Sequence, residues 1–115
     1  MNTQAVIDQG TFDDLKDVMG ADFIVELVDT YTLETEGLIK QLQAALAAGD
    51  AAVFGRLAHS IKSSSASLGA LAFSQQAREL EMLAKTGSLV GAEPLVERFW
   101  VDFLTVKQTL EELKI

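Results

Sequence analysis

The chain has 115 residues, a formal net charge of −8, one histidine and no cysteine. This length suits one domain with one core, and we expect residues 1–115 to form it. No apolar run approaches the roughly 18–20 residues of a membrane span, and the N-terminus lacks the basic segment of a signal peptide. Without cysteine there are no disulfides and no thiolate chemistry, and the acidic balance argues against nucleic acid as a partner. A cytoplasmic protein fits these observations.

A single proline and a helical spacing of apolar residues throughout the chain predict an all-α fold. The first helix should be short, with Thr11 as its N-cap, Asp14 completing a capping box, and a stop at Gly20 after Met19. A long second helix starts near Asp22. It keeps one apolar stripe, formed by Ile24, Leu27, Val28, Tyr31, Leu38, Leu42 and Leu46.

The third predicted helix carries the histidine. Gly49 should close the helix before it, Asp50 should be its N-cap, and it should end within residues 67–69. With about 100° per residue, one face of this helix is formed by Phe54, Leu57, Ile61, Ser65 and Leu68.

Two further helices complete the predicted fold. The fourth begins near Ala70 and ends at Gly87, and Pro94 fits the first turn of the last one. Four long helices with short connections predict an antiparallel up-down-up-down bundle with a short extra N-terminal helix. The expected core positions are Phe73, Ala77, Leu80 and Ala84 in the fourth helix, and Leu95, Phe99, Phe103, Val106, Leu110 and Leu113 in the last.

The stretch from Ala51 to Arg78 holds the only histidine and contains no Asp or Glu. On a helix, His59 lies roughly 160° from the centre of the apolar face, so its ring should point to solvent. Small neighbours would let a partner surface approach the ring, and cations suit an anion beside it. This spacing fits an ordinary surface histidine equally well. The neighbours one or two turns away are Ala52, Gly55, Arg56, Lys62, Ser63 and Ala66.

Several kinds of catalytic site are excluded by the residue types. One histidine, no cysteine and no Glu-x-x-His pair provide too few ligands for a transition metal. No glycine-rich loop matches a P-loop or a dinucleotide fingerprint, and the serines after Lys62 lack the frame of a nucleophile elbow. We expect these serines to form a polar end of the third helix, with Ser65 and Ser67 packed against neighbouring helices.

Nucleophilic attack by the histidine itself remains. A neutral imidazole can attack phosphorus through Nε2 when Nδ1–H donates to an acceptor that fixes this tautomer. Glu81, at the border of the fourth helix's apolar stripe, is a candidate for that acceptor, and Lys62 could offset the charge of a phosphoryl group. A solvated boundary acid would occupy the position of Glu81 just as well, so both interpretations stay open.

At these residues the sequence resembles the histidine-containing phosphotransfer (HPt) domains of multistep His–Asp phosphorelays. The family motif is Ala-His-x-Leu/Ile-Lys-Gly/Ser-Ser-x-x-x-Leu/Val-Gly, and a Leu-Glu pair downstream is matched by residues 80–81. Ser63 stands where glycine is more usual in the family. The resemblance covers nearly the whole chain, and its motif reads here as Ala58, His59, Ser60, Ile61, Lys62, Ser63, Ser64, Ser65, Ala66, Ser67, Leu68 and Gly69.

This resemblance implies a phosphocarrier rather than an autonomous enzyme. His59 would accept a phosphoryl group from an aspartyl phosphate on the receiver domain of a hybrid sensor kinase and pass it to the receiver Asp of a response regulator. Lys62 would support the phosphoryl group and Glu81 would bind Nδ1. No cofactor belongs to the chain itself, because Mg²⁺ is supplied by the receiver, and we expect a monomer.

Receivers are expected to dock on two neighbouring regions. One is the platform around the histidine, formed by Ala52, Gly55, Arg56, Ser63, Ala66 and Gly69. The other, implied by the family resemblance, is the apolar surface of the first helix and the start of the second, represented by Leu15, Val18, Met19 and Phe23.

Two other functions stay open at this stage. The chain could be a helical adaptor that binds receivers without accepting phosphate. It could also be a fragment of a chemotaxis-type histidine kinase, in which an ATP-binding domain phosphorylates the histidine.

Overall fold

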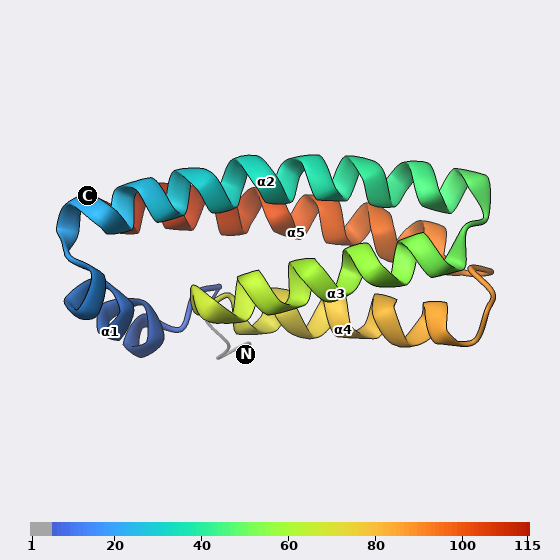
Figure 1. The fold of residues 1–115 in the computed structure, drawn as a ribbon, viewed down its shortest axis with the longest axis horizontal. Helices are drawn as coiled ribbons and strands as arrows, with labels where there is room; N and C mark the ends of the chain where they lie inside the picture. Colours follow the sequence, from blue (N-terminus) through green and yellow to red (C-terminus); the bar gives the residue numbers. More distant parts are fainter. Residues whose placement is uncertain (1–5) are drawn as a thin grey trace.

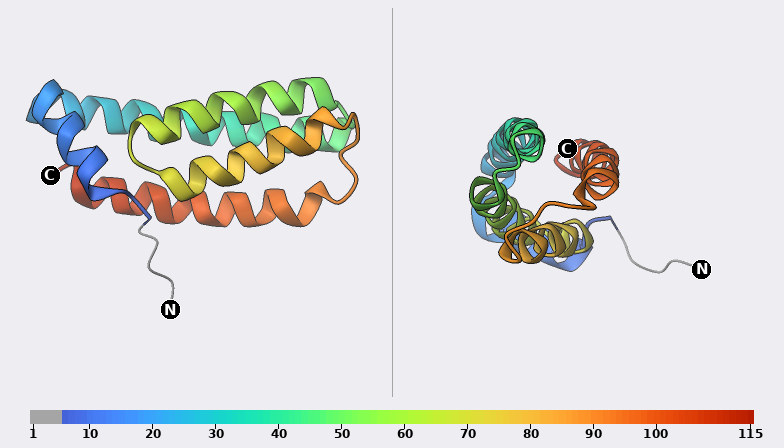
Figure 2. Two further views of the ribbon diagram at one scale, coloured as in Figure 1. Left: turned by 90° about the horizontal axis from the view of Figure 1, so that it is seen from below. Right: turned by 90° about the vertical axis from the view of Figure 1, so that its right-hand side faces the viewer.

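The computed structural model describes residues 6–115, and within this range the chain forms five α-helices and no strand. A short helix, α1 (Gln9–Met19), precedes four longer ones: α2 (Ala21–Ala48), α3 (Ala51–Ser67), α4 (Leu71–Lys85) and α5 (Ala92–Leu113). Each of the long helices runs antiparallel to the one before it (Figure 1). Both α2 and α4 pack against α3 and α5, which closes the bundle (Figure 2). The predicted four-helix bundle with an extra N-terminal helix is therefore confirmed.

The turn between α2 and α3 is set by two residues. Gly49 has the left-handed backbone conformation (φ 69°, ψ 24°), and its N–H donates to the carbonyls of Ala45 and Leu46. A residue with a side chain rarely adopts this conformation, which explains the stop at glycine. The carboxylate of Asp50 then accepts from the N–H of Val53 at 3.1 Å and caps α3. The chain thus reverses within two residues, as predicted.

The predicted start of α1 is wrong. Its N-cap is Asp8, three residues before Thr11, and α1 begins at Gln9. The carboxylate of Asp8 accepts from both the backbone N–H and the hydroxyl of Thr11. Thr11 therefore lies inside the first turn and serves as the partner of the cap rather than the cap itself, and Asp14 completes no capping box.

The core follows the helical stripes with one exception. Every core position predicted on α4 is buried, and on α5 the rings of Phe99 and Phe103 lie against Phe73, which stacks on Phe99 with ring centroids 4.3 Å apart. Leu95 was expected in the core but is 49% exposed, and Val96 is buried instead. Leu95 lines a groove between α4 and α5 together with Leu80 and Phe99. Five predicted core leucines are partly buried against the core: Leu27, Leu38, Leu46, Leu57 and Leu113.

The two serines expected against neighbouring helices behave differently. Ser65 is fully buried, and its Oγ lies 2.6 Å from Oη of Tyr31, so α3 is joined to α2 by a polar contact inside the core. Ser67 is exposed and donates to the carbonyl of Ser63 within its own helix, which corrects the expectation for this residue. None of the helices between residues 6 and 115 combines the length and apolar character that crossing a membrane requires.

Burial raises the pKa of Tyr31 to about 12, compared with about 10 for a solvated phenol. Because folding favours the neutral form, the contribution to stability is complete below about pH 10 and is lost as the pH rises through about 12, roughly 2–3 kcal/mol in total. Tyr31 is the only tyrosine. The near-ultraviolet tyrosinate absorbance should therefore titrate about two units higher in the folded protein than in concentrated urea. Equal midpoints, with circular dichroism showing an intact fold, would contradict this burial.

Candidate functional site

The site begins with two consecutive residues of α3, one of which faces the core and the other the solvent. Ala58 is completely buried in the core, and the next side chain, His59, is 58% exposed. A step of about 100° around the helix turns the ring out of the bundle. The expectation of an outward-facing histidine is therefore met.

A close contact between α3 and α4 brings the acid within reach of the histidine. A Cβ added to Gly55 would lie only 3.2 Å from Cβ of Ala84, so the two helices cross where both side chains are minimal. Because the helices are antiparallel, the turn after Gly55 on α3 faces the turn before Ala84 on α4. These turns carry His59 and Glu81. Gly55 thus has a packing role that explains a glycine within a helix.

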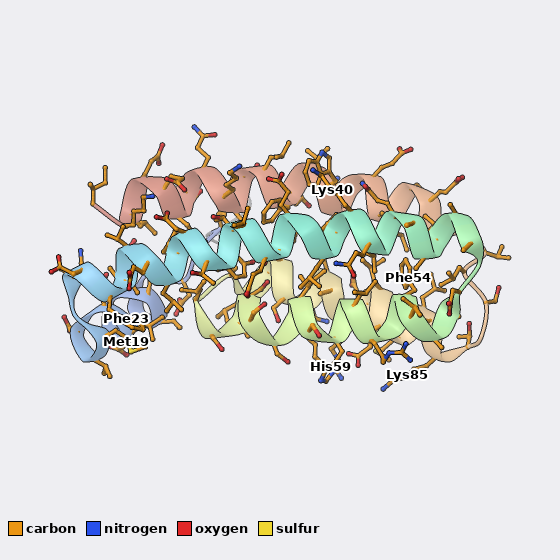
Figure 3. The ribbon with its side chains drawn as sticks, turned by 45° about the horizontal axis from the view of Figure 1, so that its top comes forward. Met19, Phe23, Lys40, Phe54, His59 and Lys85 are labelled. Carbon is orange, nitrogen blue, oxygen red and sulfur yellow. The ribbon has the colours of Figure 1, made fainter. Side chains whose placement is uncertain are left out.

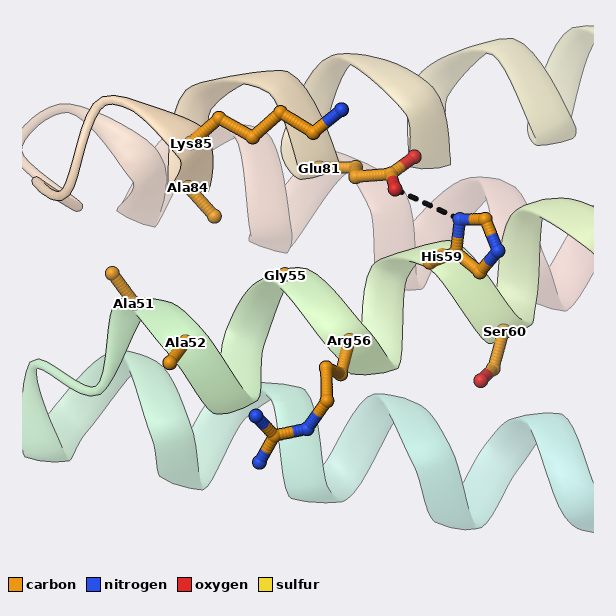
Figure 4. Close-up of a pocket in the computed structure, with 9 residues that line it drawn as sticks. All are labelled: Ala51, Ala52, Gly55, Arg56, His59, Ser60, Glu81, Ala84 and Lys85. Carbon is orange, nitrogen blue, oxygen red and sulfur yellow. Dashed lines mark hydrogen bonds and ion pairs between the residues drawn. The ribbon is translucent and has the colours of Figure 1, made fainter.

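One carboxylate binds both basic residues of the motif, His59 and Lys62. Oε2 of Glu81 lies 2.8 Å from Nδ1 of His59, and Oε1 accepts from Nζ of Lys62 at 2.8 Å (Figure 4). The Lys62 hydrogen bond, the His59 hydrogen bond and the nearby charges together hold the pKa of Glu81 below its usual value, against the effect of burial. Glu81 is therefore ionised near neutral pH.

The ionised carboxylate settles which nitrogen of the neutral ring is free. An ionised carboxylate only accepts hydrogen bonds, so Nδ1 of His59 must be the donor to Glu81. The lone pair of the neutral imidazole then lies on Nε2. In Figure 4 this second nitrogen faces away from Glu81, along α3 toward the C-terminal end of the helix. The arrangement presents an exposed nucleophile in a fixed tautomer.

A shallow hollow of about 610 Å³ lies beside the histidine on the N-terminal side of α3. Its floor is made of small side chains and two cations stand at its edges (Figure 4). A second groove, lined in part by Lys62, Ser63 and Arg78, continues between α3 and α4 on the other side of Glu81. The first hollow is lined by Ala51, Ala52, Gly55, Arg56, His59, Ser60, Glu81, Ala84 and Lys85.

Most of the residues predicted for docking lie at the surface. Ala52, Arg56 and Ser63 are exposed, and Gly55 and Ala66 are partly exposed.

At the α1–α2 end of the bundle, Val18, Met19 and Phe23 are exposed, Val18 at 82%, whereas Leu15 packs against the core. Figure 3 shows Met19 and Phe23 along the same edge of the molecule as His59, with Lys40 on the opposite edge. The two predicted docking regions thus share one side of the bundle.

Gly69 does not belong to the exposed platform, which corrects its assignment as a docking residue. It is buried beneath the segment that precedes α1, where the N–H of Asp8 donates to its carbonyl at 2.7 Å. A Cβ at Gly69 would lie 2.9 Å from the carbonyl oxygen of Asp8, and its φ is +92°. Glycine is therefore required here by a crossing of the backbone.

Two cations of α4 were not among the predicted site residues. Lys85 lines both hollows and Arg78 lines the second. Their spacing could have identified them, because Arg78 lies three residues before Glu81 and Lys85 lies four residues after it, on the same side of a helix.

Charge is distributed unevenly between the α3–α4 hairpin and the rest of the chain. Residues 51–85, which contain α3 and α4, carry four basic and two acidic side chains, a net charge of +2. The rest of the sequence carries five basic and fifteen acidic side chains, a net charge of −10. Between residues 6 and 115, no three His, Cys, Asp or Glu side chains are grouped so that they could hold a metal ion.

Two comparisons with known proteins match most of this chain. The model of the Hpt domain family matches residues 26–114. The crystal structure of histidine-containing phosphotransfer protein B (HptB) from Pseudomonas aeruginosa PAO1 is similar over 97% of this chain and 96% of that one, with 32% sequence identity and a TM-score of 0.90. A search of curated protein sequences gave no significant match.

Proposed function

Because the chain belongs to the family of Hpt domains, the histidine phosphotransfer proteins of two-component signalling, we propose that it carries phosphoryl groups on Nε2 of His59. The observation that carries this proposal is the exposed ring whose Nδ1 is held 2.8 Å from Glu81. A surface histidine without a role would not require a carboxylate from the neighbouring helix to fix its tautomer.

The chemistry needs little from this chain beyond a positioned nucleophile. The Nε2 lone pair attacks the phosphorus of an aspartyl phosphate, the N–P bond forms as the P–O bond breaks, and that electron pair leaves on the aspartate carboxylate. Nδ1 keeps its proton, and the ionised Glu81 stabilises the positive charge that the ring gains. Lys62 has three donors and can keep one on Glu81 while turning another toward a phosphoryl oxygen.

The proposed partners are receiver domains, one of a hybrid sensor kinase and one of a response regulator. Their active sites are acidic and hold the Mg²⁺ that neutralises the aspartyl phosphate, so the metal belongs to the partner. The net charge of +2 on residues 51–85 supports this pairing, since complementary charge speeds the encounter. The small side chains of the hollow beside His59 allow close approach. We expect a cytoplasmic monomer that acts as a phosphocarrier and not as an enzyme on its own.

Incubation with a phosphorylated receiver and Mg²⁺ tests the function. We expect acid-labile label to leave the receiver and to be found on this chain. Tight binding without transfer would instead support the receiver-binding adaptor. Label that comes only from an ATP-binding kinase domain would support a piece of a chemotaxis-type kinase.

Glu81→Ala should slow transfer by about ten- to a hundredfold without abolishing it, because a hydrogen bond to a charged group is worth roughly 1.5–3 kcal/mol. Glu81→Gln should lose less, since the amide oxygen still accepts from Nδ1 of His59. The measurement is the transfer rate from a phosphorylated receiver at saturating concentration. Glu79→Ala is the matched control, because Glu79 is an exposed acid of α4 that lines neither hollow beside the histidine. Parental rates for Glu81→Ala would remove this residue from the mechanism.

A further inference from the structure

The serines at the end of α3 differ in what their hydroxyls do. Ser64 and Ser67 donate to backbone carbonyls one turn back in the helix, and Ser65 pairs with Tyr31 in the core. Ser63 is exposed, and within residues 6–115 its hydroxyl has no hydrogen-bond partner. One hydroxyl of the run is therefore available to a group that arrives from outside.

Ser63 follows His59 by about one turn of α3. The two residues are four apart on one helix, so their Cβ atoms lie about 5–6 Å from each other on the same face. Side chains on a helix lean toward its N-terminus, which tilts the Ser63 hydroxyl back toward the histidine. Nε2 of His59 in turn faces the C-terminal half of α3 (Figure 4). We therefore expect a group bound to Nε2 to extend toward the Ser63 hydroxyl, one turn further along the helix.

We propose that the Ser63 hydroxyl donates a hydrogen bond to an oxygen of the phosphoryl group on Nε2 of His59. This inference rests on the proposed function and adds a phosphoryl-binding residue to it. The hydroxyl keeps its proton and forms no covalent bond. Its donor acts only after the phosphoryl group has arrived, so it stabilises the phosphorylated form relative to the free one.

Two neighbours of the phosphoryl group would then have different tasks. Lys62 is already bonded to Glu81 at 2.8 Å, so its charge is shared with that carboxylate. Ser63 is not committed to any group of the chain and can give its one donor entirely to the phosphoryl oxygens. Loss of this donor should make the N–P bond shorter-lived, because the negative oxygens of the stable state lose a partner.

The lifetime of the phosphohistidine tests the role of Ser63 without any protein partner. The chain is phosphorylated with phosphoramidate, a small donor, and the modified residue is unambiguous because His59 is the only histidine. We expect the Ser63→Ala protein to lose its label about three- to tenfold faster than the parent, the effect of one hydrogen bond. Its phosphorus NMR resonance should also shift. Ser63→Thr restores a hydroxyl and should restore most of the lifetime.

Ser64→Ala is the matched control, because it removes a hydroxyl from the next residue, on a different side of the helix, and should leave the lifetime at the parental value. Equal lifetimes for the parent and Ser63→Ala would overturn the role of Ser63 and leave the proposed function standing. A faster decay that Ser63→Thr does not slow would also overturn it, since the hydroxyl would not be the cause. A parent protein that accepts no phosphoryl group from phosphoramidate or from a receiver would instead overturn the proposed function.

Discussion

A His59→Gln variant should accept no phosphoryl group from a phosphorylated receiver, whereas the parent becomes labelled under the same conditions. Glutamine keeps a polar side chain at the same exposed position but has no nitrogen lone pair with which to attack phosphorus. The chain holds no second histidine, so no other imidazole can take over. The measurement is acid-labile label on the chain after incubation with the receiver and Mg²⁺.

The control for this variant is its fold and its binding. His59 is 58% exposed, and its contact with the protein is the bond to Glu81, so the helical circular dichroism signal should be unchanged. Receiver binding should persist as well, because the surrounding side chains remain. Label that survives in His59→Gln would assign the phosphoryl group to another residue and would contradict the role of His59 as its carrier.

The second large effect is expected from a bulky side chain beside the histidine. Ala52→Trp should slow transfer from a receiver by about ten- to a hundredfold, a range that matches the 1–3 kcal/mol cost of overfilling a close contact. Ala52 lies two helical turns from His59, about 10.5 Å along the axis. A common protein interface of about 800 Å² per partner has a radius of about 16 Å, so this position falls inside it. The transfer rate at low receiver concentration measures the effect.

Two comparisons make the Ala52→Trp result specific. Ala44 is also exposed but belongs to α2 and lines neither hollow beside the histidine, so Ala44→Trp should transfer at the parental rate. Phosphorylation of Ala52→Trp by phosphoramidate should also be unchanged, because a small donor needs no docking surface. Normal transfer from the receiver to Ala52→Trp would show that partners approach from another side.

The sequence was sufficient for features that depend on local spacing. Helical periodicity correctly turned His59 outward and Phe54 inward, because both follow from about 100° per residue. Gly49 and Asp50 marked the reversal between α2 and α3, since the left-handed turn and the cap are properties of single residues. The four-helix arrangement followed from long helices with short connections.

Features that depend on contacts between distant segments could not be predicted in the same way. From the sequence, Gly69 is the last residue of a motif expected at the surface. In the structure the segment at Asp8 crosses over Gly69 and buries it. The pairing of Glu81 with His59 depends on how closely α3 and α4 approach, and that distance is set where Gly55 meets Ala84. Spacing along one helix carries no information about the separation of two.

The uneven distribution of charge has a consequence for how two molecules meet. With +2 on one helical hairpin and −10 on the remainder, the bundle has a strong electric dipole. At a distance, an acidic protein and this molecule repel each other, because both carry net negative charge. The electric field of the acidic protein also exerts a torque on the dipole, which turns the α3–α4 hairpin toward that protein. Encounters in which the histidine already faces an acidic partner are therefore favoured over those that begin on the opposite side.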